Sequence, residues 1–109
     1  MRSALQELAL QGYCAWKNES GVWFEADGRP HAYGKKGSGD IICILPIIIG
    51  GRKIGIHAEF EAKTGTGRQN KNQKIHQEFA VERNGGVYIL FRTVAELLGE
   101  IKKVISEYQ

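Results

Sequence analysis

The chain has only two cysteines, two prolines and one methionine among its 109 residues. Cys14 and Cys43 stand alone in apolar segments, which excludes a disulfide framework or a paired-cysteine zinc site and predicts buried free thiols in a reducing compartment. No apolar run is long enough to span a bilayer, because the longest, residues 41–49, has about half the required length and contains Pro46. The first residues also lack the apolar stretch of a secretory signal. We therefore expect a soluble, cytoplasmic protein.

The bulk composition is that of one ordinary globular domain. Hydrophobic residues make up 42% of the chain and charged residues 25%, which argues against disorder and against a fibrous fold. The length predicts a single domain over residues 1–109. The formal net charge of +3 is too small to identify a nucleic-acid-binding protein by itself.

The distribution of the basic residues says more than their sum. Lys63, Arg68, Lys71 and Lys74 fall within twelve residues, and residues 64–77 contain no acid. Such a cluster can follow a phosphate backbone, or it can be the solvated start of a helix. Composition alone leaves both interpretations open.

Hydrophobic periodicity predicts an α/β domain with one mixed sheet flanked by helices. The order of elements is α-β-β-β-α-β-α when an optional short strand at 22–25 is left out, and the strands on either side of the central helix are expected to be parallel. Pro46 should mark a bulge or the point where strand pairing ends. The predicted helices end at Gly12, cover 70–83 and cover 94–105; the strands cover 13–17, 22–25, 41–49, 53–63 and 87–91, with a loop at 27–39. The β-branched run at 41–49 is typical of a strand covered on both faces.

The strand at 53–63 carries an unusual set of side chains. Alternation places His57, Glu59, Glu61 and Lys63 on one face and apolar residues on the other. Burying charged groups is costly unless they are paired or bind something, whereas on a solvent-facing strand they would form an incidental ion pair. A carboxylate and a lysine two residues apart are what phosphodiester hydrolysis needs, because the carboxylate holds a divalent cation and the lysine offsets phosphate charge.

A second metal ligand must come from another element, and Asp40 is the candidate. It follows a glycine-containing loop and directly precedes the apolar strand. Alone it would more often be a turn residue. Together with Glu61 and Lys63 it indicates a metal-dependent phosphodiesterase site.

These segments resemble a known nuclease family. An acid-bearing loop followed by a strand and an acid-x-lysine motif is similar to the PD-(D/E)XK pattern. The later motifs narrow the resemblance to the virus-type replication-repair nuclease domain (VRR-NUC), found alone in phages and fused in repair nucleases. The matching segments, within residues 12–98, are Gly37-Ser38-Gly39-Asp40, Glu61-Ala62-Lys63-Thr64, Gly67-Arg68-Gln69-Asn70-Lys71-Asn72-Gln73, His76 and Gly85-Gly86-Val87-Tyr88.

The resemblance implies a restriction-endonuclease-like fold and a set of site roles. Asp40 and Glu61 would bind Mg²⁺ or Mn²⁺ together with the main-chain carbonyl of Ala62. Lys63 would be the catalytic lysine, and Gln73 the helix glutamine near the site.

Three positions leave alternatives open. Gln73 can instead close a capping box with Asn70, since it would stand at the third helical position. Glu7 is the only candidate for the acid that the family often carries on its first helix, and it lies too near Gly12 to be included. Glu59 is an extra acid on the site face, either an outer-shell group or simply exposed.

The function that we expect is structure-specific DNA cleavage by a dimer that resembles a Holliday-junction resolvase. Arg68, Lys71 and Lys74 would contact the DNA, and the final helix or the first strand could supply a two-fold contact. The alternatives are an inactive nucleic-acid-binding module and a restriction-type nuclease. His57 and His76 could act as general bases, but a structural hydrogen bond is the commoner role for such residues.

Overall fold

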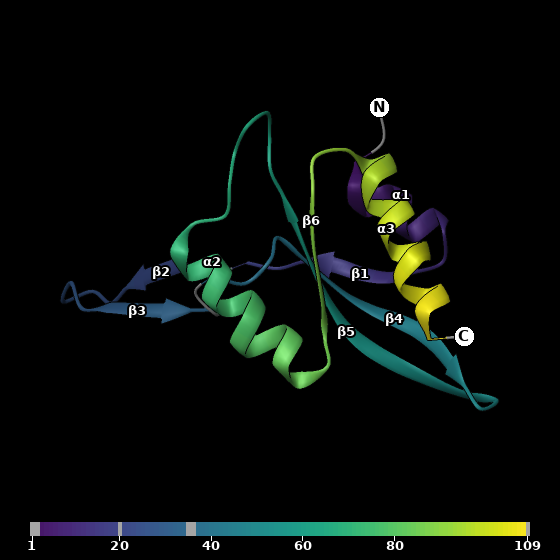
Figure 1. The fold of residues 1–109 in the computed structure, drawn as a ribbon. Helices are drawn as coiled ribbons and strands as arrows, with labels where there is room; N and C mark the ends of the chain where they lie inside the picture. Colours follow the sequence, from purple (N-terminus) through teal and green to yellow (C-terminus); the bar gives the residue numbers. More distant parts are fainter. Residues whose placement is uncertain (1–2, 20, 35–36, 109) are drawn as a thin grey trace.

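The computed structural model describes residues 3–19, 21–34 and 37–108 and has a mixed α/β architecture. A four-stranded sheet in the order β1-β4-β5-β6 has helices on both faces, with α1 and α3 on one face and α2 with its continuation on the other (Figure 1). The elements are α1 (Ala4–Leu10), β1 (Cys14–Lys17), β2 (Gly21–Phe24), β3 (Pro30–Tyr33), β4 (Ile41–Ile49), β5 (Arg52–Ala62), α2 (Lys71–Ile75), η1 (His76–Val81), η2 (Glu82–Asn84), β6 (Val87–Phe91) and α3 (Val94–Glu107).

The long antiparallel pair of β4 and β5 forms the centre of the sheet. Its register runs from Ile49 opposite Arg52 to Ile41 opposite Phe60. The connecting turn consists of Gly50 and Gly51, which have φ angles of 57° and 78°. A two-residue turn with positive φ at both residues has the twist that fits the flanking strands of a hairpin. This turn therefore sets which residues of the two strands face each other.

Pro46 lies where β4 loses one of its two neighbours. β1 pairs with β4 only from Lys17 opposite Ile41 to Cys14 opposite Ile44, so Pro46 lies beyond the end of that ladder. Pairing with β1 thus ends two residues before Pro46, whereas pairing with β5 continues through Pro46, which lies opposite Gly55.

The strands β5 and β6 are parallel, as predicted from the helix that joins them. That segment begins as α2, continues as the π-helix η1 and ends as the 3₁₀-helix η2, where the sequence predicted one uniform helix. The chain then reverses at Gly85, which has a φ of 84°.

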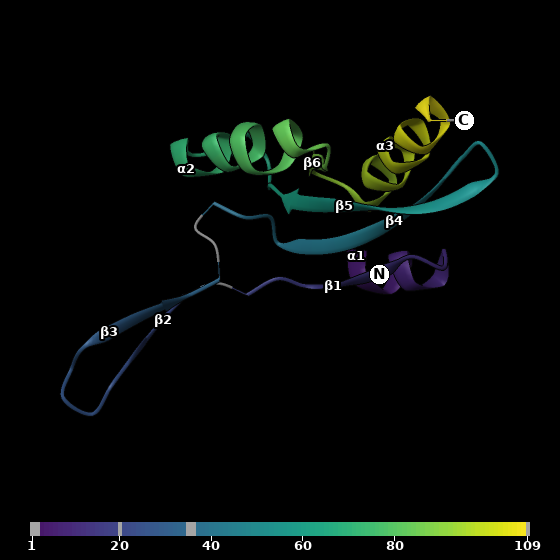
Figure 2. The same cartoon turned by 90° about the horizontal axis from the view of Figure 1, so that it is seen from below.

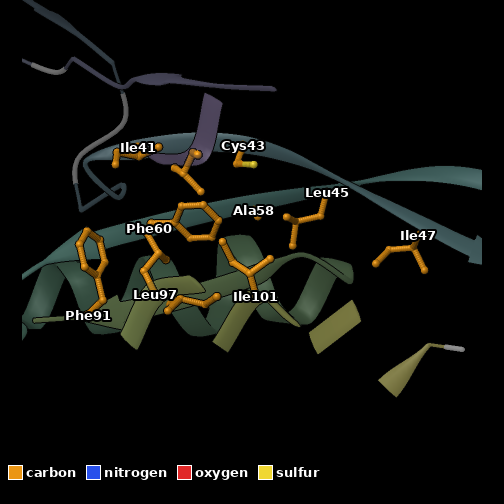
Figure 3. Close-up of a cluster of buried hydrophobic side chains, with 11 residues drawn as sticks. Ile41, Cys43, Leu45, Ile47, Ala58, Phe60, Phe91, Leu97 and Ile101 are labelled. Atoms are coloured by element: carbon orange, nitrogen blue, oxygen red, sulfur yellow. The ribbon is translucent and has the colours of Figure 1, made fainter. Parts of the chain in front are cut away.

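The hydrophobic core lies between the sheet and the α1–α3 side. Phe60 of β5 is fully buried and points toward Leu97 and Ile101 of α3, which are also fully buried (Figure 3). The apolar stripe of the final helix therefore covers the sheet. Because the stripe packs against the sheet of its own chain, only the first strand remains of the two predicted dimer contacts.

Three expectations about the fold are wrong. The predicted loop at 27–39 contains β3, which pairs with β2 as a hairpin that extends away from the body of the protein (Figure 2). The radius of gyration of 15.5 Å exceeds the roughly 13 Å typical of a compact chain of this length, in keeping with that hairpin. β4 is covered on both faces only near Ile41, since Ile44 and Ile48 are about half exposed. Cys43 is buried, but Cys14 is exposed.

No helix within the described residues has the length and apolar character needed to cross a membrane.

Candidate functional site

The pairing of β4 with β5 brings Asp40 and Glu61 together. Ile41 lies opposite Phe60 at the end of the ladder, so the next residues outward, Asp40 and Glu61, face each other across the strand ends. The Oδ2 atom of Asp40 accepts a 2.9 Å hydrogen bond from the main-chain N–H of Ala62. Glu61 is 4% exposed, whereas Asp40 is exposed. The two strands thus place one buried and one accessible carboxylate side by side.

Lys63 and Gln73 converge on the same oxygen of Glu61. The Nζ atom of Lys63 lies 3.5 Å from Oε1, and the Nε2 atom of Gln73 donates to Oε1 at 2.7 Å. The other oxygen, Oε2, is buried and accepts no hydrogen bond from any described residue. Burial and the nearby charge of Asp40 raise the pKa of Glu61 despite the opposing effect of Lys63. One oxygen of Glu61 is therefore buried without a hydrogen-bond partner among the described residues, in a carboxylate that is close enough to Asp40 to be affected by its charge.

Gln73 combines the two roles that the sequence left open. Its Oε1 atom accepts from the N–H of Asn70 at 2.9 Å, while the side chain of Asn70 accepts from the N–H of Gln73 at 2.8 Å. This is the predicted capping box, and it uses only the carbonyl end of the Gln73 amide. The amide nitrogen remains directed at Glu61. The start of α2 is thereby fixed to the carboxylate.

Glu59 is buried rather than exposed, and both of its oxygens have partners. Its Oε1 atom accepts from the N–H of Gly39 at 2.9 Å and lies 2.8 Å from Nε2 of His76. Its Oε2 atom lies 2.7 Å from Nε2 of His57. Burial alone would raise the pKa of Glu59, but the hydrogen bonds with His57, Gly39 and His76 outweigh burial and lower it. Glu59 thus holds the residue that directly precedes Asp40.

Two glycines let the loop before β4 approach the site closely. Gly37 has a φ of 84°, and a Cβ there would clash with the main-chain carbonyl oxygen of Asn72. A Cβ on Gly39 would lie 3.1 Å from the Cβ of Glu59. The sequence showed the glycine-containing loop before Asp40 but could not indicate that α2 and Glu59 are its neighbours.

The remaining predicted residues lie around this centre in different ways. Arg68, Lys71 and Lys74 are exposed, in the loop before α2 and on α2 itself. Glu7 lies on α1, which covers the opposite face of the sheet from α2 (Figure 1). Lys71 and Lys74 belong to the same short helix as Gln73, which binds Glu61, whereas Glu7 belongs to an element on the other face.

Tyr88 is a neighbour that the sequence analysis did not single out as a site residue. It lies opposite Glu59 in the parallel pair, is 9% exposed, and has a pKa raised to about 12 by burial and by the charges of Glu61 and Glu59. Its phenol therefore stays protonated beside ionised carboxylates. Its place opposite Glu59 follows from the β5–β6 register, which the sequence did not specify.

The donor set is smaller than that of many protein metal sites. The described part of the chain contains no group of three or more His, Cys, Asp or Glu side chains arranged to hold a metal ion. Asp40 and Glu61 supply two carboxylates, and the carbonyl of Ala62 is the further oxygen that the family resemblance implies. Hard divalent cations such as Mg²⁺ accept few protein ligands and retain several waters, so this set fits such an ion.

Comparisons with protein-family models, with curated proteins and with solved structures find no match to this chain.

Proposed function

We propose that this protein is a metal-dependent DNA endonuclease that hydrolyses phosphodiester bonds at the Asp40–Glu61 pair. One observation carries the proposal: the buried Oε2 atom of Glu61 has no hydrogen-bond partner among the described residues, and the charge of Asp40 acts on the same carboxyl group. A buried acceptor without a partner costs stability, and two adjacent carboxylates repel. A divalent cation between them would relieve both costs.

The roles follow from the contacts of each side chain. Asp40, Glu61 and the carbonyl of Ala62 would hold Mg²⁺ or Mn²⁺, which when bound supplies positive charge to the attacked phosphate. Gln73 fixes the orientation of Glu61. Lys63, whose side chain is 19% exposed, keeps its ammonium at the edge of the site, where it can orient water and offset phosphate charge.

The exposed basic residues on α2 and in the loop before it support DNA as the partner. Arg68, Lys71 and Lys74 are exposed and can contact phosphates on either side of the cleaved bond. We infer a preference for branched or otherwise structured DNA from the resemblance to VRR-NUC proteins. We also place the protein in the cytoplasm of a bacterial or phage-infected cell, where free cysteines stay reduced.

Cutting both strands of a four-way junction would need two copies of the chain, because one chain carries one Asp40–Glu61 pair. We therefore propose a homodimer. Since α3 covers its own sheet, the remaining predicted contact is β1, which lies at the sheet edge and carries the half-exposed Trp16.

The test is cleavage of plasmid, linear and four-way-junction DNA with Mg²⁺, with Mn²⁺ and with a chelator. We expect cleavage only with metal, and a loss of about 100-fold or more in Asp40→Ala, Glu61→Ala and Lys63→Ala. The matched control is Lys103→Ala, an exposed lysine on α3 that should cut normally.

The outcomes separate the alternatives. DNA binding without cleavage under any metal would favour an inactive nucleic-acid-binding module. Cleavage confined to one base sequence would favour a restriction-type nuclease. Unimpaired cutting by Lys63→Ala would remove the catalytic assignment.

A further inference from the structure

A pocket of about 460 Å³ lies beside the carboxylate pair, on the same face of the sheet. Its floor is formed by Ile42 of β4 and Glu59 of β5, and its helical wall by His76 and Ala80 of η1. A volume of this size is within the range of small-molecule binding sites. The catalytic proposal leaves the pocket without a role.

The pocket is one step along the strands from the proposed catalytic centre. Ile42 and Glu59 are partners in the β4–β5 ladder, as Asp40 and Glu61 are at its end. Residues two apart on a strand lie roughly 6.6 Å apart on the same face. That spacing is close to the reach from a phosphate to the base of its own nucleotide. A phosphate at Asp40 and Glu61 can therefore place an attached nucleoside over Glu59.

The chemistry of the walls suits a flat heterocycle. Ile42 and Ala80 are apolar, and His57, whose side chain is about half exposed, presents an imidazole ring on which a base can stack. Glu59 does not present a bare negative charge to a nucleotide, because two imidazoles and a main-chain N–H already bind its oxygens.

Two amides complete the lining and are held in place by the protein. Asn18 donates through Nδ2 to the hydroxyl of Ser38 at 2.7 Å and to the carbonyl of Gly39 at 2.9 Å. Asn84 donates through Nδ2 to the carbonyl of Ala80 at 3.0 Å. With the nitrogens engaged, the carbonyl oxygen of each amide is the atom left to accept from a base N–H. These groups are fixed before a ligand binds, which lowers the entropic cost of binding it.

From these observations we propose that the pocket binds the nucleoside next to the cleaved phosphate, unstacked from the DNA. This inference rests on the proposed nuclease function for its biological setting. The pocket itself is tested by binding alone, so that the two can fail separately.

The decisive measurement compares two ligands that differ only by the base. Deoxyadenosine 5′-monophosphate and 2-deoxyribose 5-phosphate are titrated with Mg²⁺ into isotope-labelled protein, and binding is followed by NMR. We expect the base-bearing ligand to bind about tenfold more tightly, which is the usual contribution of one stacked base. Signals from His57, His76 and Asn84 should shift with that ligand only.

Filling the pocket should abolish this difference. In Ala80→Phe the aromatic ring occupies the pocket, so the two ligands should bind equally; Ala80→Leu provides a smaller change if the first variant fails to fold. Ala95→Phe, at an exposed position of α3, is the matched control and should keep the tenfold preference. Equal binding of both ligands by the unaltered protein, or a preference that survives pocket filling, overturns the proposal.

Cleavage assays then test the pocket proposal separately from the proposed nuclease function. If DNA is cut, removing the base beside the mapped cleavage site should raise KM about tenfold in the unaltered protein and have little effect in Ala80→Phe. Cleavage that ignores the missing base overturns the pocket proposal and leaves the nuclease intact. Preferential binding of the base-bearing ligand without any cleavage of DNA supports the pocket proposal and contradicts the proposed nuclease function.

Discussion

Replacing Glu61 with glutamine should make the metal-free protein more stable. Glu61 and Glu59 occupy the same face of β5 and are almost equally buried, at 4% and 3% exposed, yet their pKa values shift in opposite directions. Glu61 has an oxygen without a partner, whereas Glu59 has partners for both. The matched variants Glu61→Gln and Glu59→Gln should therefore change the free energy of unfolding with opposite signs.

The size of the Glu61 effect follows from its contacts. An unpaired buried acceptor costs up to about 3 kcal/mol when it is charged and has a like charge beside it. Removing the charge gives up the contact with Lys63, worth up to about 1 kcal/mol at partial exposure. It also weakens the hydrogen bond from Gln73 by about 1 kcal/mol. The net gain is about 1 kcal/mol, or about 4 °C in Tm for a domain of this length.

The sign of the stability change in Glu61→Gln can be checked by measuring it at different pH values. The pKa of Glu61 is raised above its ordinary value of 4.5, so the folded protein binds that proton more tightly than the unfolded chain. The resulting stabilisation is present below pH 4.5 and is lost as pH rises through the raised pKa. The advantage of Glu61→Gln should therefore appear above that pKa and vanish below about pH 4.5.

Glu59 should show the reverse dependence. Its lowered pKa stabilises the fold above 4.5, and this contribution is lost as pH falls through the folded-state value. Glu59→Gln should therefore be less stable than the unaltered protein at neutral pH, with a deficit that shrinks in acid.

The assay is thermal unfolding by circular dichroism at pH 7.5 and pH 4, with a chelator and with Mg²⁺. Mg²⁺ should raise the Tm of the unaltered protein and have little effect on Glu61→Gln, because the ligand is gone. A Glu61→Gln protein that is less stable than the unaltered one at pH 7.5 in chelator would refute the reasoning.

Three further results are expected. Gln73→Ala should lose about 1 kcal/mol of stability from the capping box and also reduce cleavage, whereas Asn70→Ala should lose the cap alone, as unfolding and rate measurements on both would show. Replacing Arg68, Lys71 and Lys74 together with glutamine should weaken DNA binding across sequences and reduce the slope of log affinity against log salt by about 3; an unchanged slope would place the phosphates elsewhere. Light scattering should give a dimer, with paired nicks on a four-way junction, and a monomer making single nicks would remove the resolvase interpretation.

The sequence predicted the site best where a local repeat governs the structure. Alternation along one strand was enough to place Glu59, Glu61 and Lys63 on a common face, and the spacing of three between Asn70 and Gln73 was enough to predict the capping box. Both patterns depend only on geometry within a few residues. The role of Asp40 needed the family resemblance in addition, because a single acid after a glycine loop has many uses.

Contacts between distant segments could not be predicted in this way. Glu59 meets His76, seventeen residues later, because η1 crosses the sheet with one particular rotation. No periodicity specifies that rotation, and the π-helical turns alter it further. β3 was missed for another reason: its four residues, which include Pro30 and His31, lie in a glycine-rich stretch whose composition favours a loop.

The turn at Gly50 and Gly51 is remote from the carboxylates, yet it determines whether they lie opposite each other. Asp40 and Glu61 lie roughly 30 Å from it along the strands, ten residues away on each side. They face each other only because the same number of residues separates each of them from a turn of fixed length. A single residue inserted into β5 between the turn and Phe60 would leave every side chain of the site in the sequence but place Phe60, not Glu61, opposite Asp40. A change at this turn can thus disturb the proposed site from the far end of the two strands, without altering any of the side chains that form it.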